Sequence, residues 1–183
     1  MRTFIAVNFD NGIKEKILEV RNRLKSVFPL KRVKWEEKNN FHITLQFLGE
    51  TDENKAAEII SALEKISTGF DKIFIAAENV DAFPNMFRAK VLFLGLRDVD
   101  GRLAHLAQEV SDSLIDTGFS PDKKFHSHIT LGRVKEFGKV NNAEHLKTIR
   151  GDFQCEVKSF EFMKSTLKPS GSEYEVIRSF PIR

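Results

Sequence analysis

The chain has 183 residues, of which 41% are hydrophobic and 30% are charged, and its formal net charge is +3 at pH 7. This length can bury a substantial core, the composition excludes a disordered chain, and no apolar run approaches the roughly 18 residues of a membrane-spanning helix. The modest positive charge favours a local phosphate-attracting cleft over a broad DNA-binding surface, and the single cysteine, together with the lack of a secretory signal, leads us to expect a cytoplasmic protein.

Strands and helices are predicted to alternate along the chain. The strands follow from polar and apolar residues that alternate with period two, and the helices from apolar residues that recur every three or four positions. Asp10 or Asn11 and then Asp52 are suited to cap the first two helices, and Gly118 to close the third. In order, we expect strands at 2–9 and 31–35, a helix between them, a strand at 41–47, a helix at 53–67, strands at 70–79 and 89–96, a helix at 101–117, a strand at 125–133, a short helix after Asn142, and strands at 154–163 and 173–180.

Two of these predicted strands contain the same tetrapeptide, His-Ile-Thr-Leu, at 42–45 and 128–131. Side chains two apart on a strand share a face and are about 7 Å apart, so His42 and Thr44 point one way, as do His128 and Thr130. One such pair is ordinary for a solvated strand face, but two identical copies in a chain with five histidines indicate a function. If the strands face each other, two imidazoles and two hydroxyls converge, and such a group can move protons around a phosphate without a metal.

Paired His-x-Thr-x motifs half a chain apart resemble those of the two-histidine (2H) phosphoesterases. The flanking segments narrow the resemblance to the bacterial and archaeal RNA 2′,3′-cyclic phosphodiesterases, formerly described as 2′-5′ RNA ligases. The similar segments are Trp35 with residues 40–50, residues 125–133, the tail 165–174 and the opening residues 1–6. The likeness spans nearly the whole chain. It departs from the family at Ser127, where Pro is frequent, and at Lys124, where Arg is frequent.

The order strand, helix, His-strand occurs twice, with 86 residues between His42 and His128, and no linker rich in Gly, Ser or Pro separates the halves. We therefore expect a single bilobal domain over residues 1–183 with interleaved lobes, each carrying one motif strand (around 41–47 and 125–133). The resemblance implies an α+β fold in which two antiparallel sheets with flanking helices are related by a pseudo-twofold around a central cleft. It also implies that the first and last strands share one lobe.

The resemblance assigns His42 as the general acid to the 3′-oxygen and His128 as the general base for water, giving a 2′-phosphomonoester. The two motifs are symmetric and do not set this order by themselves. Thr44 and Thr130 are expected to donate hydrogen bonds to phosphoryl oxygens.

Arg133 follows the second motif and is a candidate phosphate or base contact. Strict alternation places it on the face opposite His128, so its reach depends on the strand twist after Gly132. His126 shares the phase of the motif and is expected at the surface. Cys155 is expected to be a small strand residue rather than a nucleophile.

The predicted partner is RNA or a nucleotide with a 2′,3′-cyclic phosphate end. No cofactor, metal, membrane or obligate protein partner is expected, and the protein is expected to be a monomer. A metal-dependent phosphodiesterase is disfavoured because no Asp/His cluster has ligand spacing. Two alternatives stay open: a 2′-5′ RNA ligase or transferase that runs the same chemistry backwards, and a non-catalytic nucleotide- or RNA-binding module.

Overall fold

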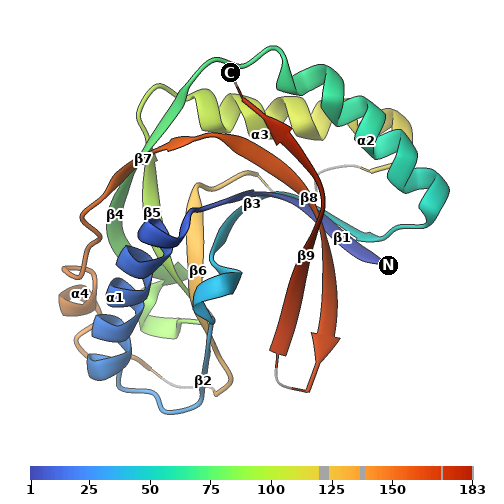
Figure 1. Ribbon diagram of the computed structural model, residues 1–183. Helices are drawn as coiled ribbons and strands as arrows, with labels where there is room; N and C mark the ends of the chain where they lie inside the picture. Colours follow the sequence, from blue (N-terminus) through green and yellow to red (C-terminus); the bar gives the residue numbers. More distant parts are fainter. Residues whose placement is uncertain (120–123, 137–138, 170, 183) are drawn as a thin grey trace.

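The computed structural model describes residues 1–119, 124–136, 139–169 and 171–182, which form an α+β fold with two antiparallel sheets (Figure 1). The predicted fold class is confirmed. The strands are β1 (Arg2–Asn8), β2 (Val33–Trp35), β3 (His42–Glu50), β4 (Ile73–Phe83), β5 (Val91–Asp98), β6 (His128–Val134), β7 (Gln154–Val157), β8 (Ser159–Lys168) and β9 (Gly171–Pro181). The helices are α1 (Asn11–Val27), α2 (Glu53–Ser67), α3 (Arg102–Ser113) and α4 (Ala143–Leu146), with short 3₁₀ turns η1 (Lys38–Asn40), η2 (Met86–Arg88) and η3 (Ile115–Thr117).

Each half of the chain contributes strands to both sheets. The first sheet has the order β3-β1-β8-β9, so β1 lies between a strand of its own half and a strand more than 150 residues later. The second sheet has the order β2-β6-β5-β4-β7, in which β4 and β2 come from the first half. Figure 1 shows the orange β8 beside the blue β1, and the red β9 pairs with β8, which places the first and last strands in the same sheet, as expected.

The helices begin where capping residues were predicted. The carboxylate of Asp10 accepts the backbone N–H of Ile13 at 2.9 Å, and that of Asp52 accepts the N–H of Lys55 at 2.9 Å. Gly118 adopts φ +85° after η3, a conformation that favours glycine. Helices α2 and α3 pack against each other, and α3 also packs against β3, β4 and β5, so it joins the two sheets. Within the described residues, every helix is too short or too polar to span a lipid bilayer.

The predicted strand at 154–163 is wrong as one element. The chain breaks at Lys158: β7 pairs with β4 in the second sheet, and β8 pairs with β1 in the first. Val157 and Phe160 are both buried although they are three residues apart, so the alternation of buried and exposed side chains shifts by one residue at the break. Such a shift also occurs at a bulge within a single strand, so it does not by itself reveal a change of sheet.

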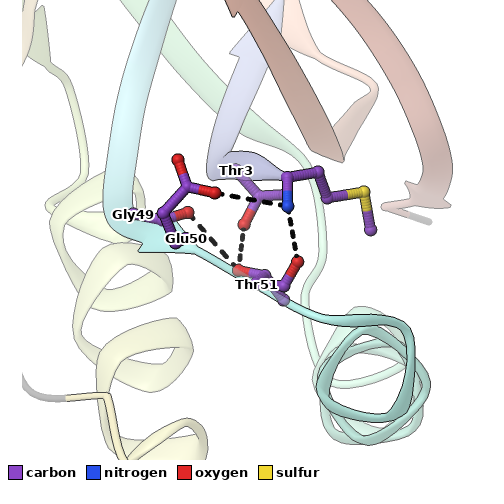
Figure 2. Close-up of polar contacts among 5 residues, drawn as sticks. Thr3, Gly49, Glu50 and Thr51 are labelled. Atoms are coloured by element: carbon purple, nitrogen blue, oxygen red, sulfur yellow. Dashed lines mark hydrogen bonds and ion pairs between the residues drawn. The ribbon is translucent and has the colours of Figure 1, made fainter.

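Polar contacts fasten the corner where β1 begins and β3 ends (Figure 2). The α-amino group of Met1 donates to the carbonyl oxygen of Thr51 at 2.9 Å and lies 3.3 Å from a carboxylate oxygen of Glu50. The buried hydroxyls of Thr3 and Thr51 share a hydrogen bond of 2.6 Å. Because each buried hydroxyl has a partner, these polar groups are enclosed without an unmet hydrogen bond. The first motif strand is thus held at the end distant from its histidine.

Candidate active site

The two motif strands present their side chains as the alternation predicts. Ile43 and Leu45 of β3 are buried in the core, and so are Ile129 and Leu131 of β6. The intervening His and Thr side chains are only half-buried, on the other side of each strand. β3 and β6 lie against each other although they belong to different sheets. We call the residues His42, Thr44, His128, Thr130 and Arg133 the two-histidine site.

Both motif strands contain a bulge at the fourth motif position. In β3 the pairing with β1 skips Leu45, and in β6 the pairing with β5 skips Leu131. An extra residue reverses the alternation beyond it. Leu131 and Gly132 are consequently both buried, and Arg133 points to the side of Thr130 rather than away from it. The face predicted for Arg133 by strict alternation is therefore wrong, and the physical reason is the bulge.

The two imidazoles are held in the same way. Nδ1 of His42 lies 2.7 Å from the carbonyl oxygen of Asn40, and Nδ1 of His128 lies 2.6 Å from that of His126. A carbonyl oxygen can only accept, so Nδ1 carries the hydrogen in both rings, and Nε2 is the nitrogen left to exchange protons. Nε2 of His42 also lies 3.1 Å from the hydroxyl oxygen of Thr44.

The aromatic surroundings of the two rings differ. The ring of His42 packs against Phe4 and, edge-on, against Tyr174, with centroid distances of 5.1 and 5.2 Å. The ring of His128 packs edge-on against Phe83 and Phe93 at 5.2 and 5.3 Å. Apolar walls of this kind favour a neutral imidazole over an imidazolium ion.

Burial lowers the pKa of both histidines. For His42 the pKa falls to about 4; the hydrogen bond to the Asn40 carbonyl opposes this change, and the nearby charges of His128, Lys14 and Arg133 reinforce it.

For His128 burial likewise lowers the pKa, opposed by the bond to the His126 carbonyl and reinforced by the charges of His126 and Arg133. Arg133 therefore lies within electrostatic reach of both rings, and both rings are neutral at pH 7 when the site is empty.

Two groups at this site were not predicted from the sequence. Glu36 follows β2 directly, and its carboxylate lies 3.7 Å from Nε of Arg133. Burial raises the pKa of Glu36, while the Arg133 charge opposes that rise. Burial and the negative charge of Glu36 also raise the pKa of Tyr174, the only tyrosine of the chain. Tyr174 lay in the tail segment that carried the family resemblance, which was the one available signal for it.

The hairpin that carries Tyr174 is tied to the turn before the first motif. The amide of Asn40 donates to the carbonyl oxygen of Ser172 at 2.9 Å. The same Asn40 accepts from His42 through its own carbonyl. One residue thus connects β9 to the orientation of His42.

Cys155 lies half-buried in β7, where burial raises the pKa of its thiol to about 11. A thiol with a raised pKa is a weak nucleophile at neutral pH, in keeping with the expected structural role. Among the described residues, no three or more His, Cys, Asp and Glu side chains cluster as metal ligands do.

The model of the family described as LigT like phosphoesterase matches the chain in two consecutive segments, residues 7–93 and 94–174. A protein of Archaeoglobus fulgidus named RNA 2′,3′-cyclic phosphodiesterase is 37% identical over 181 residues, which cover 98% of this chain and 99% of the relative. A protein of Methanocaldococcus jannaschii with the same name is 32% identical over 186 residues, which cover 98% and 100%.

Solved structures show the same fold. A Thermus thermophilus protein superposes with a TM-score of 0.83 at 24% identity, over 100% of this chain and 98% of that one. E. coli LigT in complex with 3′-AMP superposes with a TM-score of 0.78 at 22% identity, over 99% and 97%. From the family match and the near full-length relatives, the chain belongs to the LigT-like phosphoesterase family.

Proposed function

We propose that this protein hydrolyses RNA 2′,3′-cyclic phosphate ends to 2′-phosphomonoesters, with His42 as general acid and His128 as general base. The observation that supports this proposal most is that the two imidazoles are held by the same kind of hydrogen bond. Each ring gives its Nδ1–H to a carbonyl and keeps Nε2 for proton exchange, with Arg133 in electrostatic reach of both. The activity named for the A. fulgidus and M. jannaschii relatives agrees with this chemistry.

In the proposed reaction, Nε2 of His128 takes a proton from the water that attacks phosphorus. A P–O bond forms to this water oxygen while the bond from phosphorus to the 3′-oxygen breaks. Nε2–H of His42 protonates the departing 3′-oxygen, so the total number of protons on the two rings is unchanged. The carbonyl partners of Nδ1 fix each ring and stabilise whichever imidazolium forms.

Three other groups face the phosphate in this proposal. The hydroxyls of Thr44 and Thr130 donate to the phosphoryl oxygens, and the guanidinium of Arg133 adds a charge-assisted donor that Glu36 holds in place. These donors stabilise the charge that grows on the phosphoryl oxygens in the transition state.

The low pKa of His42 in the empty site has a consequence for the acid step. A general acid must carry a proton, and a ring with a pKa of about 4 is neutral at pH 7. The anionic phosphodiester favours the charged form of an adjacent imidazole, so binding of the substrate raises this pKa. We therefore expect substrate binding to take up one proton.

The test is incubation with a nucleoside 2′,3′-cyclic phosphate in EDTA, with the product isomer identified by phosphorus NMR. The expected product is the 2′-phosphate. A 3′-phosphate would contradict the assignment of the departing 3′-oxygen, and tight binding without turnover would contradict catalysis altogether. Adding an RNA with a free 5′-hydroxyl tests the ligase alternative, which predicts a 2′-5′ linked product in place of hydrolysis.

A further inference from the structure

A basic groove lies at the end of the second sheet, outside the two-histidine site. Its volume is about 920 Å³, and four cationic side chains line it: Arg88, Lys90, Lys135 and Lys139. Pro84, Ala89 and Val134 contribute apolar surface to the same groove. The combination of apolar surface and exposed cations suits a chain of phosphates with sugars and bases between them.

The groove continues the sheet that carries His128. Phe83 of β4, Val91 of β5 and Arg133 of β6 lie in one row across the strands. The next row begins the groove: the N–H of Lys90 donates to the Phe83 carbonyl at 2.8 Å, and the N–H of Val134 donates to the Lys90 carbonyl at 2.9 Å. Since Phe83 packs against His128 and Arg133 belongs to the two-histidine site, the groove starts one residue beyond that site.

The charge of the groove is strongly one-sided. One carboxylate, that of Glu136, faces four cations, and one of its oxygens already accepts the backbone N–H of Arg32. The surplus of three positive charges equals the formal net charge of the entire chain. Across the described part of the chain, none of the four cations lies within 4 Å of a carboxylate oxygen. Their charge is therefore available to a ligand.

We propose that the basic groove binds the phosphodiester backbone of RNA on the 5′ side of the nucleotide being hydrolysed. The proposal rests on the proposed function, because the cyclic phosphate in the two-histidine site fixes where the strand begins. That phosphate closes the 3′ end, so the remaining RNA can only leave from the 5′ side of the terminal nucleotide. The groove offers the adjoining positive surface, and a mononucleotide is too short to reach it.

The test compares two substrates and two matched double variants. The substrates are a nucleoside 2′,3′-cyclic phosphate and an oligoribonucleotide, about ten nucleotides long, with the same cyclic end. The groove variant is Lys90→Glu with Lys135→Glu, and the control is Lys65→Glu with Lys72→Glu, which changes the net charge equally. Lys65 is exposed on α2. Lys72 is also exposed and comes directly before the first residue of β4, about 30 Å along that strand from Phe83 at its other end.

We expect the groove variant to lower kcat/KM for the oligoribonucleotide at least tenfold and to leave the mononucleotide within about twofold of wild type. Its salt dependence on the oligoribonucleotide should weaken, with the slope of log(kcat/KM) against log[salt] smaller by about 1.4, since two phosphate contacts are lost and each is worth about 0.7 on a single strand. The control should match wild type on both substrates. Unchanged mononucleotide turnover also shows that the groove variant is folded.

Three results would overturn the proposal: equal losses in both double variants, no loss in the groove variant, or equal losses on both substrates. If wild type hydrolyses neither substrate, the proposed function has failed, and the groove is judged by binding instead. Fluorescence anisotropy with the labelled oligoribonucleotide then supports the groove if only the groove variant binds more weakly, and rejects it if both variants bind alike.

Discussion

The strands β3 and β6 share their local geometry and differ in their neighbours. Each holds its histidine through a carbonyl two residues earlier, and each skips its fourth motif residue in the pairing with the next strand. The ring of His42 then meets Tyr174 from the C-terminal hairpin, whereas the ring of His128 meets Phe83 and Phe93 of its own sheet. The repeated sequence thus holds both rings through Nδ1 in the same way, while their aromatic neighbours and the contact of Nε2 of His42 with Thr44 differ.

The clearest difference lies just beyond the bulges. Phe47 and Arg133 occupy equivalent positions, opposite Phe4 on β1 and Val91 on β5. Phe47 is 61% exposed, while Arg133 is paired with Glu36. Of these two equivalent positions, only the one on β6 therefore carries a positive charge. This asymmetry distinguishes the two motifs in a way that their identical tetrapeptides do not.

Removing either imidazole should produce the largest effect. We expect His42→Ala and His128→Ala each to slow single-turnover hydrolysis of a nucleoside 2′,3′-cyclic phosphate by about 10²–10⁴, the usual worth of a positioned acid or base. His145→Ala is the control, because His145 is exposed on α4. A rate near wild type in either motif variant would contradict the paired mechanism.

Acid should destabilise the protein through His42. Its pKa is about 4 in the folded state against 6.5 for the unperturbed side chain, so between these values the unfolded state binds more protons and stability rises with pH. The contribution is complete above pH 6.5 and is lost as the pH falls to about 4, up to about 3 kcal/mol.

Urea unfolding of wild type and His42→Gln at pH 7 and pH 4 measures this contribution. The variant should lose less stability between the two pH values. His128→Gln should also lose less stability than wild type between pH 7 and pH 4, because burial lowers the pKa of His128 too. Identical losses in wild type and His42→Gln would show that His42 is not held neutral in the folded protein.

Replacing the residue beyond each bulge, Arg133 on β6 or Phe47 on β3, tests whether only the β6 position contributes to catalysis. Arg133→Ala removes a charge-assisted donor worth about 1.5–3 kcal/mol, so kcat/KM should fall about 10- to 100-fold. Arg133→Lys should recover part of the loss because it keeps the charge without the planar fork. Phe47→Ala should change the mononucleotide rate less than threefold. Equal effects of Phe47→Ala and Arg133→Ala would remove the proposed role of Arg133.

The two threonines should give the smallest effects. Thr44→Val and Thr130→Val each remove one neutral donor, worth about 0.5–1.5 kcal/mol, and kcat/KM should fall about 3- to 10-fold. The Thr44 variant should lose more, because its hydroxyl also contacts Nε2 of His42. A greater loss of kcat/KM in Thr130→Val than in Thr44→Val would contradict the expected role of the Thr44 contact with His42.

Local sequence patterns predicted the features that local physics controls. The caps at Asp10 and Asp52 and the buried faces of both motif strands follow from near neighbours in the chain. The bulges do not, because His-Ile-Thr-Leu fits regular alternation equally well and the skipped residue is visible only in the pairing with β1 or β5. Because the bulge in β6 was not predicted, the face of the strand on which Arg133 lies was not predicted either.

Long-range packing explains the remaining omissions. Glu36 and Tyr174 belong to the candidate site only because β2 and β9 are brought to it from distant parts of the chain. The break at Lys158 likewise depends on two different partner strands. The duplication itself was predicted from the repeated order strand, helix, His-strand, with 86 residues between His42 and His128. The family match likewise falls in two consecutive segments, residues 7–93 and 94–174.

The central place of β1 in its sheet affects how the protein is made. Residues 2–6 pair with residues 161–165 of β8, so β1 lacks one partner until nearly the whole chain has left the ribosome. At about 5–20 residues per second, the nascent chain waits roughly 8–30 s with that edge unpaired. An open strand edge invites pairing with other chains, and synthesis that stalls before residue 159 leaves the first histidine strand in a sheet that cannot close.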